Sequence, residues 1–201
     1  MRPSTEQAGD PGITDARRSV HRASFKAPIG EILLVADEWG LRELHLPGSF
    51  AREDATSASR PTNAALEQGL EQLEAYFAGE LTQFDLPLTP EGTDFQLKVW
   101  RALKDIGFAK TESYGSVAAR IGNPKASRAV GMANNKNPLA IVIPCHRVIG
   151  ANGSLVGYGG GLWMKQWLLN HEAAVAGHND AGRHLGPRPD RAALPSQATV
   201  S

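Results

Sequence analysis

The sequence predicts an α+β fold in two parts, a strand-rich part followed by a mostly helical part. Three observations indicate this division. Residues 21–46 alternate short apolar runs with turn residues, residues 93–173 show repeated helical spacing, and the Pro- and Gly-bearing stretch FDLPLTPEG at 84–92 lies between them. A chain of 201 residues forms one large domain or two small ones. We therefore expect domains at 21–88 and 93–173.

The strand-rich part opens with three apolar segments, SFKAP, EILLVA and LRELHL, within residues 24–46. Turn residues separate them at 28–30 (Pro-Ile-Gly) and at 37–40 (Asp-Glu-Trp-Gly), so we expect a meander of three strands. A charged and polar loop, 47–61, follows. Leucine and phenylalanine side chains then recur at helical spacing, which predicts a helix over about 63–79.

Helix signals dominate the second part. Thr93 and Gln96 have the spacing of a capping box, and they predict a helix that Gly107 ends. Ser113 is placed to cap a short helix that ends at Gly122. A last helix is expected at 161–173, after the glycine-rich loop GSLVGYGGG.

A further helix is expected between these elements. Asn123 as N-cap and Pro124 as the first helical residue would begin it, and it would run to about Asn134. Two short helices joined by a tight Gly-Asn-Pro turn are typical of a helix-turn-helix motif.

Charge divides the chain in the same way. Residues 21–92 carry 12 Asp and Glu against 5 Lys and Arg, whereas residues 93–172 carry 4 against 10. A basic half beside an acidic half suggests that the basic half meets an anion such as nucleic acid. Uneven surface charge with no partner is the alternative, and charge alone leaves both open.

The composition limits the classes of protein that fit. One cysteine excludes an intrachain disulfide and any CxxC zinc site, and the histidines show no metal-ligand spacing. No apolar run reaches membrane-spanning length, and the N-terminus lacks the apolar stretch of a signal peptide. We therefore expect a cytoplasmic protein that no membrane holds. Residues 1–20 and 174–201 lack periodicity and are expected to be disordered tails.

The second helix of the pair, PKASRAVGMANN, has an unusual composition for a DNA-reading helix. Small residues surround one long side chain, Arg128, whereas a major-groove helix usually carries several long polar side chains. Small residues let a helix approach a narrow groove while one arginine enters the base stack, which suits minor-groove binding. Ordinary helix packing also explains small residues, and it stays open.

The stretch IVIPCHRVIG at 141–150 holds the chain's one cysteine, Cys145. A buried, inert thiol would suit these apolar surroundings. A nucleophile presented by a turn is the alternative, and Pro144 can supply the turn. A reactive thiol needs a base, and His146 is adjacent, although contact would require a turn or a bridging water. Glu172, at the end of the last predicted helix, is the candidate carboxylate to orient that histidine.

Three stretches carry a resemblance to a known family: SYGSVAARIGNPKASRAVGMANNKNP, IPCHRVIG and GYGGGLWMKQWLLNHE. They are similar to the O6-alkylguanine-DNA alkyltransferases, also called methylated-DNA–protein-cysteine methyltransferases. The family's signature is PCHR followed by a hydrophobic pair, and it stands intact at 144–149. The resemblance is strong over residues 93–173, whereas the N-terminal half matches in layout only.

This resemblance implies a ribonuclease-H-like N-terminal domain and a winged-helix-like helix-turn-helix domain that carries the reactive cysteine. It implies DNA repair by irreversible transfer of the alkyl group, typically methyl, from O6-alkylguanine in double-stranded DNA to Cys145. O4-alkylthymine would react more weakly. The target nucleotide would flip out from the minor groove, because O6 lies inside the duplex stack. Each molecule would act once, as a monomer and without a cofactor; cooperative binding to DNA stays open.

The resemblance also implies roles for single residues. Cys145 would be the nucleophile, His146 would take its proton through a water, and Glu172 would orient the imidazole of His146. Asn137 would hold the active-site turn. Tyr114 would crowd the target phosphate and donate a hydrogen bond to N3 of the flipped base.

Two further sets of residues follow from the resemblance. Arg128 would fill the gap that the flipped nucleotide leaves. The other DNA-facing residues would be Asn123, Lys125, Ala126 and Ser127. The guanine pocket would be lined by Val148, Tyr158, Gly159 and Gly160.

The sequence departs from some family members in two respects. Some carry a zinc site in the N-terminal half that is built partly from cysteines, and we expect none here because that half has no cysteine. Gly159 and Ala140 stand where some relatives have serine and proline. Both positions bear on pocket flexibility and therefore on the acceptance of bulky O6 substituents.

Two other functions are weighed against alkyl transfer. A non-catalytic module that recognises damaged DNA would not need Cys145, His146 and Glu172 together. A cysteine hydrolase would use Cys145 and His146, but adjacent residues make poor direct partners, and the DNA-binding pattern would be unexplained.

Overall fold

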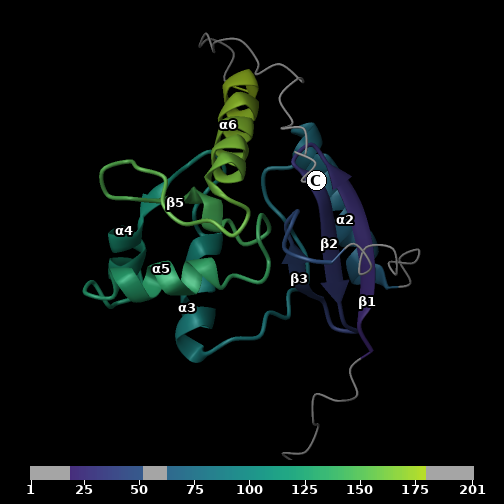
Figure 1. Cartoon of the computed structure of the whole chain (residues 1–201), viewed down its shortest axis with the longest axis horizontal. Coiled ribbons are helices and arrows are strands. Elements are labelled where there is room, and N and C mark those ends of the chain that lie inside the picture. Colours follow the sequence, from purple (N-terminus) through teal and green to yellow (C-terminus); the bar gives the residue numbers. More distant parts are fainter. Residues whose placement is uncertain (1–18, 52–62, 180–201) are drawn as a thin grey trace, which may run out of the picture.

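The computed structural model describes residues 19–51 and 63–179, which form two lobes that lie side by side (Figure 1). Within the described residues, the N-terminal lobe has three strands and a helix. They are β1 (His21–Ala27), β2 (Gly30–Ala36), β3 (Leu41–His45) and α2 (Ala64–Ala78). The three strands form one antiparallel sheet in the order β1-β2-β3, which confirms the predicted meander.

Local sequence explains the elements of this lobe. Gly30 turns the chain between β1 and β2 at a φ of 120°, and an added Cβ there would lie 2.8 Å from Pro47 Cγ, so only glycine fits. Asn63 caps α2, because its side chain accepts from the backbone N–H of Ala65. Gly79 ends the helix in the left-handed conformation at a φ of 81°. The predicted helix over about 63–79 is confirmed.

The C-terminal lobe is mostly helical. Its helices are α3 (Asp94–Lys104), α4 (Tyr114–Arg120), α5 (Ser127–Asn135), the 3-10 turn η2 (Cys145–Arg147) and α6 (Leu162–Asn179). Two short strands, β4 (Glu112–Ser113) and β5 (Val148–Ile149), pair in parallel beside α4. The capping box of Thr93 and Gln96 is present at the start of α3, as predicted.

Three predicted helix boundaries are wrong. Asn123 does not cap a helix: its carbonyl accepts from Ala126 N–H in a separate turn, and α5 begins at Ser127. The first helix ends at Lys104, since Asp105 N–H already bonds back to Leu103, before Gly107.

The last helix continues beyond its predicted end at residue 173, to Asn179. The start of the predicted C-terminal tail is therefore helical. The rest of both predicted tails, and of the loop 47–61 beyond residue 51, lies outside the described residues.

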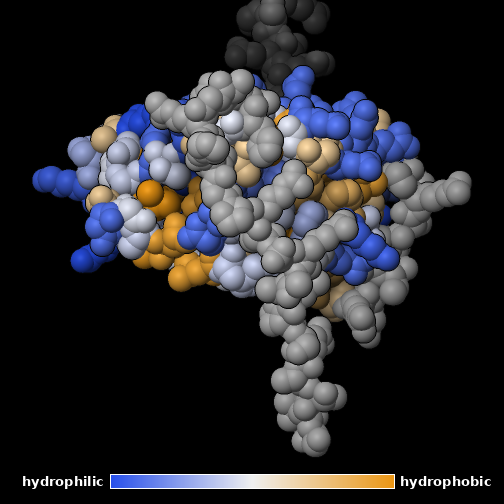
Figure 2. All heavy atoms as spheres, turned by 90° about the horizontal axis from the view of Figure 1, so that it is seen from above, coloured by the Kyte–Doolittle hydropathy of each residue, from blue (hydrophilic) through white to orange (hydrophobic). Residues whose placement is uncertain are grey.

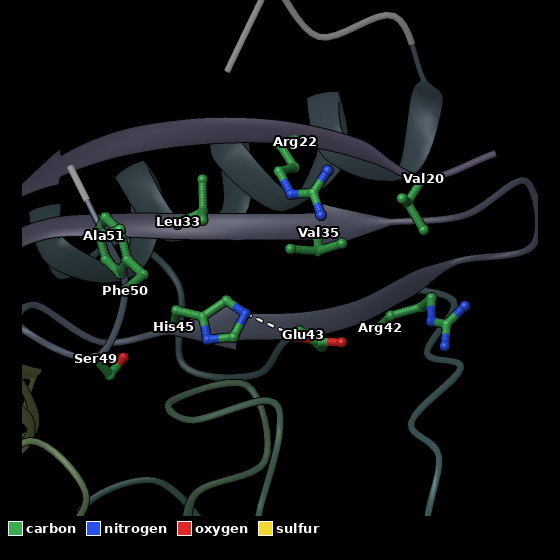
Figure 3. A pocket seen from close by; sticks show the side chains of 10 residues that line it. All are labelled: Val20, Arg22, Leu33, Val35, Arg42, Glu43, His45, Ser49, Phe50 and Ala51. Atoms are coloured by element: carbon green, nitrogen blue, oxygen red, sulfur yellow. Dashed lines mark ion pairs between the residues drawn. The ribbon is translucent and has the colours of Figure 1, made fainter. Parts of the chain in front are cut away.

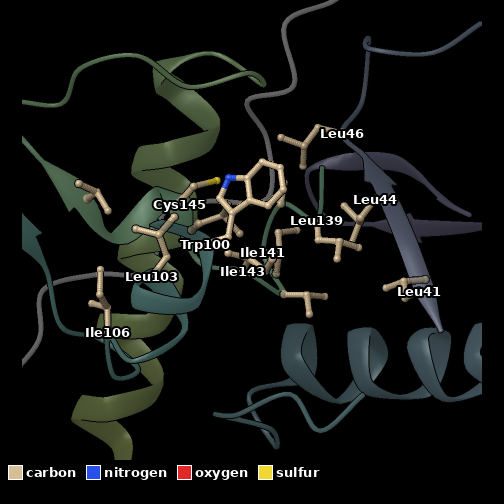
Figure 4. Close-up of a cluster of buried hydrophobic side chains, with 14 of the residues drawn as sticks. Leu41, Leu44, Leu46, Trp100, Leu103, Ile106, Leu139, Ile141, Ile143 and Cys145 are labelled. Carbon is tan, nitrogen blue, oxygen red and sulfur yellow. The ribbon is translucent and has the colours of Figure 1, made fainter. Parts of the chain in front are cut away.

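A continuous apolar core joins the two lobes. Buried leucines of β3 belong to the same cluster as Trp100, Leu103 and Cys145 of the C-terminal lobe (Figure 4). The free edge of β3 is also paired. Leu41 forms a bridge with Leu88 of the predicted linker, and Leu44 forms one with Leu139. The segment between the lobes therefore packs along the sheet.

Figure 2 shows blue hydrophilic residues together with smaller orange hydrophobic patches. Over the described residues, no helix has the length and apolar character needed to cross a membrane.

Candidate active site at Cys145

Cys145 begins the 3-10 turn η2, and its side chain is buried at the join of the two lobes. The backbone before it is tightly folded: Val142 N–H donates to Ala140 O, and Cys145 N–H donates to Ile143 O at 2.7 Å. Ile141 has a φ of 73°, which is rare for a β-branched residue. Such strain costs roughly 1–3 kcal/mol and persists only where the surroundings impose it.

Asn137 ties this turn together. Its side-chain amide donates to Ile143 O at 2.7 Å, and its side-chain oxygen accepts from Leu139 N–H at 3.0 Å. One side chain thus bridges the segment that leaves α5 and the segment that presents the thiol. These bonds hold together the turn that leads to Cys145.

His146 and Glu172 form a buried pair, with Nε2 of His146 2.8 Å from Oε1 of Glu172. An ionised carboxylate only accepts hydrogen bonds, so Nε2 carries the proton and donates. In the neutral imidazole, Nδ1 is then the unprotonated acceptor. Nδ1 is buried and has no hydrogen-bond partner within the described ranges. The histidine therefore presents a free basic nitrogen.

Glu172 is ionised because several donors converge on it. The guanidinium of Arg147 donates to both carboxylate oxygens, Tyr76 Oη donates at 3.0 Å, and the backbone N–H of Ala109 donates at 2.9 Å. Burial opposes ionisation, but the hydrogen bonds from His146 and Arg147 outweigh it and lower the pKa of Glu172 to about 2.

The two groups that would exchange the thiol proton both rest uncharged. Burial raises the pKa of the Cys145 thiol, although Asn137 and Lys165 partly offset this. Burial also lowers the pKa of His146, more than Glu172 raises it. Both shifts have one cause, since a buried site disfavours charge. The cysteine therefore needs a base at neutral pH.

Tyr114 and Lys165 organise the loop beside the thiol. Tyr114 Oη donates to Val156 O at 3.2 Å, and Lys165 Nζ donates to Val148 O at 2.6 Å and to Val156 O at 2.9 Å. Burial raises the pKa of Tyr114, with the nearby Cys145 adding to it, so the phenol keeps its proton and can donate.

A hollow of about 200 Å³ opens beside Cys145. Of the four residues expected to line a guanine pocket, Tyr158 and Gly159 line it, whereas Val148 and Gly160 do not. Val148 is fully buried, and its carbonyl accepts from Lys165. Gly160 packs instead against Met164 and Leu46, where an added Cβ would lie within 3.1 Å of both.

The predicted DNA-facing residues lie together at the start of α5. Asn123, Lys125 and Arg128 are exposed, and Ala126 and Ser127 are half-buried. Gly131, on the next turn of the helix, faces the Tyr114 ring, which an added Cβ would approach to 3.8 Å.

Sequence reasoning missed four residues that support the site: Tyr76, Asn134, Arg147 and Lys165. Arg147 lies inside the PCHR motif, so a signal was present, but Tyr76 belongs to the other lobe and nothing local marks it. Asn134 lines the hollow, and its side-chain oxygen is buried without a partner in the described part of the chain. Within that part, no three side chains of metal-binding type gather.

Comparison with known families matches both lobes. Residues 20–90 match the ribonuclease-like domain of 6-O-methylguanine DNA methyltransferase, and residues 94–174 match its DNA-binding domain. The methylated-DNA–protein-cysteine methyltransferase of Methanosarcina acetivorans is 50% identical over 155 residues, 77% of this chain and 99% of that protein. The protein of that name from Mycobacterium leprae is 46% identical over 76% of this chain and 92% of its own length.

Solved structures agree. The crystal structure of the Mycobacterium tuberculosis O6-methylguanine methyltransferase superposes with a TM-score of 0.69 at 46% identity, over 78% of this chain and 94% of that one. A structure described as the M. tuberculosis OGT in complex with DNA has a TM-score of 0.69 over 77% and 94% of the two chains. Two domain models match the chain, relatives are about 50% identical to it, and its cysteine lies beside a buried histidine–glutamate pair. The chain therefore belongs to the methylated-DNA–protein-cysteine methyltransferase family.

Proposed function

We propose that this protein repairs DNA by transferring the methyl group of O6-methylguanine to Cys145, in a single irreversible turnover. The observation that carries the proposal is the buried arrangement of Cys145 beside the His146–Glu172 pair, at the wall of a hollow next to a helix-turn-helix motif. The names of the half-identical relatives, which act on methylated DNA and a protein cysteine, support it.

The step balances without a cofactor. His146 Nδ1 takes the thiol proton through an intervening water, and the Cys145 thiolate attacks the methyl carbon. The bond from carbon to O6 breaks, its electron pair stays on the base, and a thioether forms. In the net reaction the thiol proton replaces the methyl group on guanine. Glu172 stabilises the imidazolium that forms meanwhile, and Tyr114 donates to N3 of the leaving base.

Access to the base requires that the nucleotide leave the duplex. Arg128, exposed at the start of α5 among small residues, enters the stack from the minor groove and fills the gap. Asn123, Lys125, Ala126 and Ser127 contact the DNA backbone around it. The protein acts as a monomer on double-stranded DNA in the cytoplasm, and it accepts O4-alkylthymine more weakly.

Intact-protein mass spectrometry tests this function. After mixing with duplex DNA that contains one O6-methylguanine, the chain gains one methyl group, which peptide mapping places on Cys145. Excess DNA adds no second group. Cys145→Ala binds the same duplex but gains no mass. DNA binding without a mass shift in the unsubstituted protein would instead indicate a damage-recognition module, and repeated turnover on an ester would indicate a hydrolase.

A further inference from the structure

One wall of the Cys145 hollow comes from the N-terminal lobe. The C-terminal lobe supplies the end of α5, the turn that follows it and the loop at Tyr158 and Gly159. The remaining wall consists of β3 and the residues just after it. Its members are Glu43, Leu44, His45, Leu46 and Ser49.

Backbone pairing fixes this wall in place. Leu44 N–H donates to Pro138 O at 2.7 Å, and Leu44 also forms a parallel bridge with Leu139. Pro138 and Leu139 follow Asn137 directly in the turn that presents the thiol. The position of β3 relative to Cys145 is therefore set by hydrogen bonds as well as by packing.

His45 and Glu43 line the edge of the hollow, and a hydrogen bond joins their side chains. Nε2 of His45 lies 2.7 Å from Oε2 of Glu43, and this hydrogen bond is the main cause that lowers the pKa of Glu43. The His45 ring also meets the edge of the Phe50 ring, with centroids 6.4 Å apart. The imidazole is thus restrained from two sides, although about a third of it is exposed.

A second hollow, of about 530 Å³, lies across the outer face of the sheet (Figure 3). By register, His45 is opposite Leu33 and Glu43 is opposite Val35 on β2, and these apolar residues form its floor. Glu43, His45 and Ser49 line both hollows. The His45–Glu43 pair therefore stands between the thiol pocket and a larger space.

The small volume of the thiol pocket makes the position of His45 and Glu43 at its edge important for which substrates fit. Pockets that enclose drug-sized ligands measure about 300–1,000 Å³, and 200 Å³ is below that range. A flipped base leaves little of it free, so an O6 substituent much larger than methyl needs room beyond the pocket. The nearest room lies past His45.

We propose that His45, held by Glu43, limits the size of the O6-alkyl group that can reach Cys145, so that the N-terminal lobe determines specificity. To react, an aromatic or extended substituent such as benzyl would have to extend past His45 into the hollow on the sheet face. This inference rests on the proposed alkyl transfer and adds the residue that selects among alkyl groups.

The experiment compares two duplexes, one with O6-methylguanine and one with O6-benzylguanine, by the rate at which mass is added to Cys145. In His45→Ala, the ratio of the benzyl rate to the methyl rate rises about tenfold over the unsubstituted protein, the effect expected for removing a few atoms from a pocket wall. His45→Phe keeps a ring and lacks the bond to Glu43, so its ratio rises less than that of His45→Ala.

The matched control is His21→Ala, the same substitution on the same sheet at a residue that lines neither hollow. Its ratio stays at the unsubstituted value. A ratio that stays unchanged in a folded His45→Ala protein, with an unaltered melting curve, would overturn the inference while methyl transfer itself continues. Absence of methyl transfer in the unsubstituted protein would instead remove the proposed function.

Discussion

At the scale of single residues, the two groups that would exchange the thiol proton, Cys145 and His146, both rest uncharged. Burial raises the pKa of the thiol and lowers the pKa of His146, so both rest neutral. Glu172 stays ionised, because His146 and the guanidinium of Arg147 donate to it. In the proposed reaction, proton transfer would create a thiolate and an imidazolium together, and the carboxylate of Glu172 would stabilise the imidazolium.

The depressed pKa of Glu172 predicts acid sensitivity of the fold. Its pKa is about 2 in the folded protein against an ordinary 4.5, so its contribution to stability is complete above pH 4.5 and is lost as the pH falls toward 2. The difference corresponds to roughly 3 kcal/mol. Urea unfolding at a series of pH values measures it.

In Glu172→Gln, the free energy of unfolding falls less between pH 4.5 and 2 than in the unsubstituted protein. Glu74→Gln is the matched control, because the Glu74 side chain is exposed on α2. That variant keeps the full pH dependence. Parallel curves for Glu172→Gln and the unsubstituted protein would show that Glu172 is not the group responsible.

At the scale of elements, the helix pair positions Arg128, which is exposed at the start of α5. Ser113 caps α4, a turn at Gly122 and Asn123 ends it, and α5 packs on both α3 and α4. Trp100 of α3 anchors α5 by donating to Ala133 O at 2.9 Å. These contacts hold α5 against α3 and α4, and Arg128 is exposed on its first turn.

Arg128→Ala should separate repair of duplex DNA from reaction with the free base. Filling the stack matters only when a nucleotide must flip, and unstacking costs a few kcal/mol. We expect methyl transfer from duplex DNA to slow roughly 10- to 100-fold, and transfer from free O6-methylguanine to keep its rate. Arg120→Ala, an exposed arginine at the end of α4 that pairs with Glu112, is the control. An equal loss on both substrates would contradict the role of Arg128.

At the scale of the whole molecule, the two lobes build one site. β3 supplies a wall of the thiol pocket, and Tyr76 of α2 donates to the carboxylate that orients His146. The hydrocarbon core also runs without a break between the lobes. The lobes should therefore unfold together in one transition.

Tyr76→Phe tests this coupling. It removes one hydrogen bond to a buried carboxylate, which should cost roughly 2 kcal/mol of stability and lower the methyl-transfer rate. Tyr158→Phe is the matched control for stability, because the Tyr158 hydroxyl is buried without a hydrogen-bond partner among the described residues. Its loss should leave the free energy of unfolding unchanged or raised. Equal stability of the two variants would show that Tyr76 does not support Glu172.

Local patterns were sufficient for much of the fold. Alternation and turn residues predicted the three strands, helical spacing predicted α2, and the Thr93–Gln96 box predicted the start of α3. The start of α5 was missed. Asn123 and Pro124 suit a helix N-terminus and a turn equally, and the bond from Ala126 N–H to Asn123 O selects the turn.

By itself, the sequence determined the family and predicted the nucleophile Cys145 with its partners His146 and Glu172, because a short motif and helix spacing carry that information. Only the tertiary structure decided which residues of the N-terminal lobe complete the site. Tyr76 lies 96 residues from Glu172 along the chain, and His45 reaches the thiol pocket only because β3 pairs with the turn after Asn137. Contacts of that kind depend on how the lobes pack, and no local pattern records them.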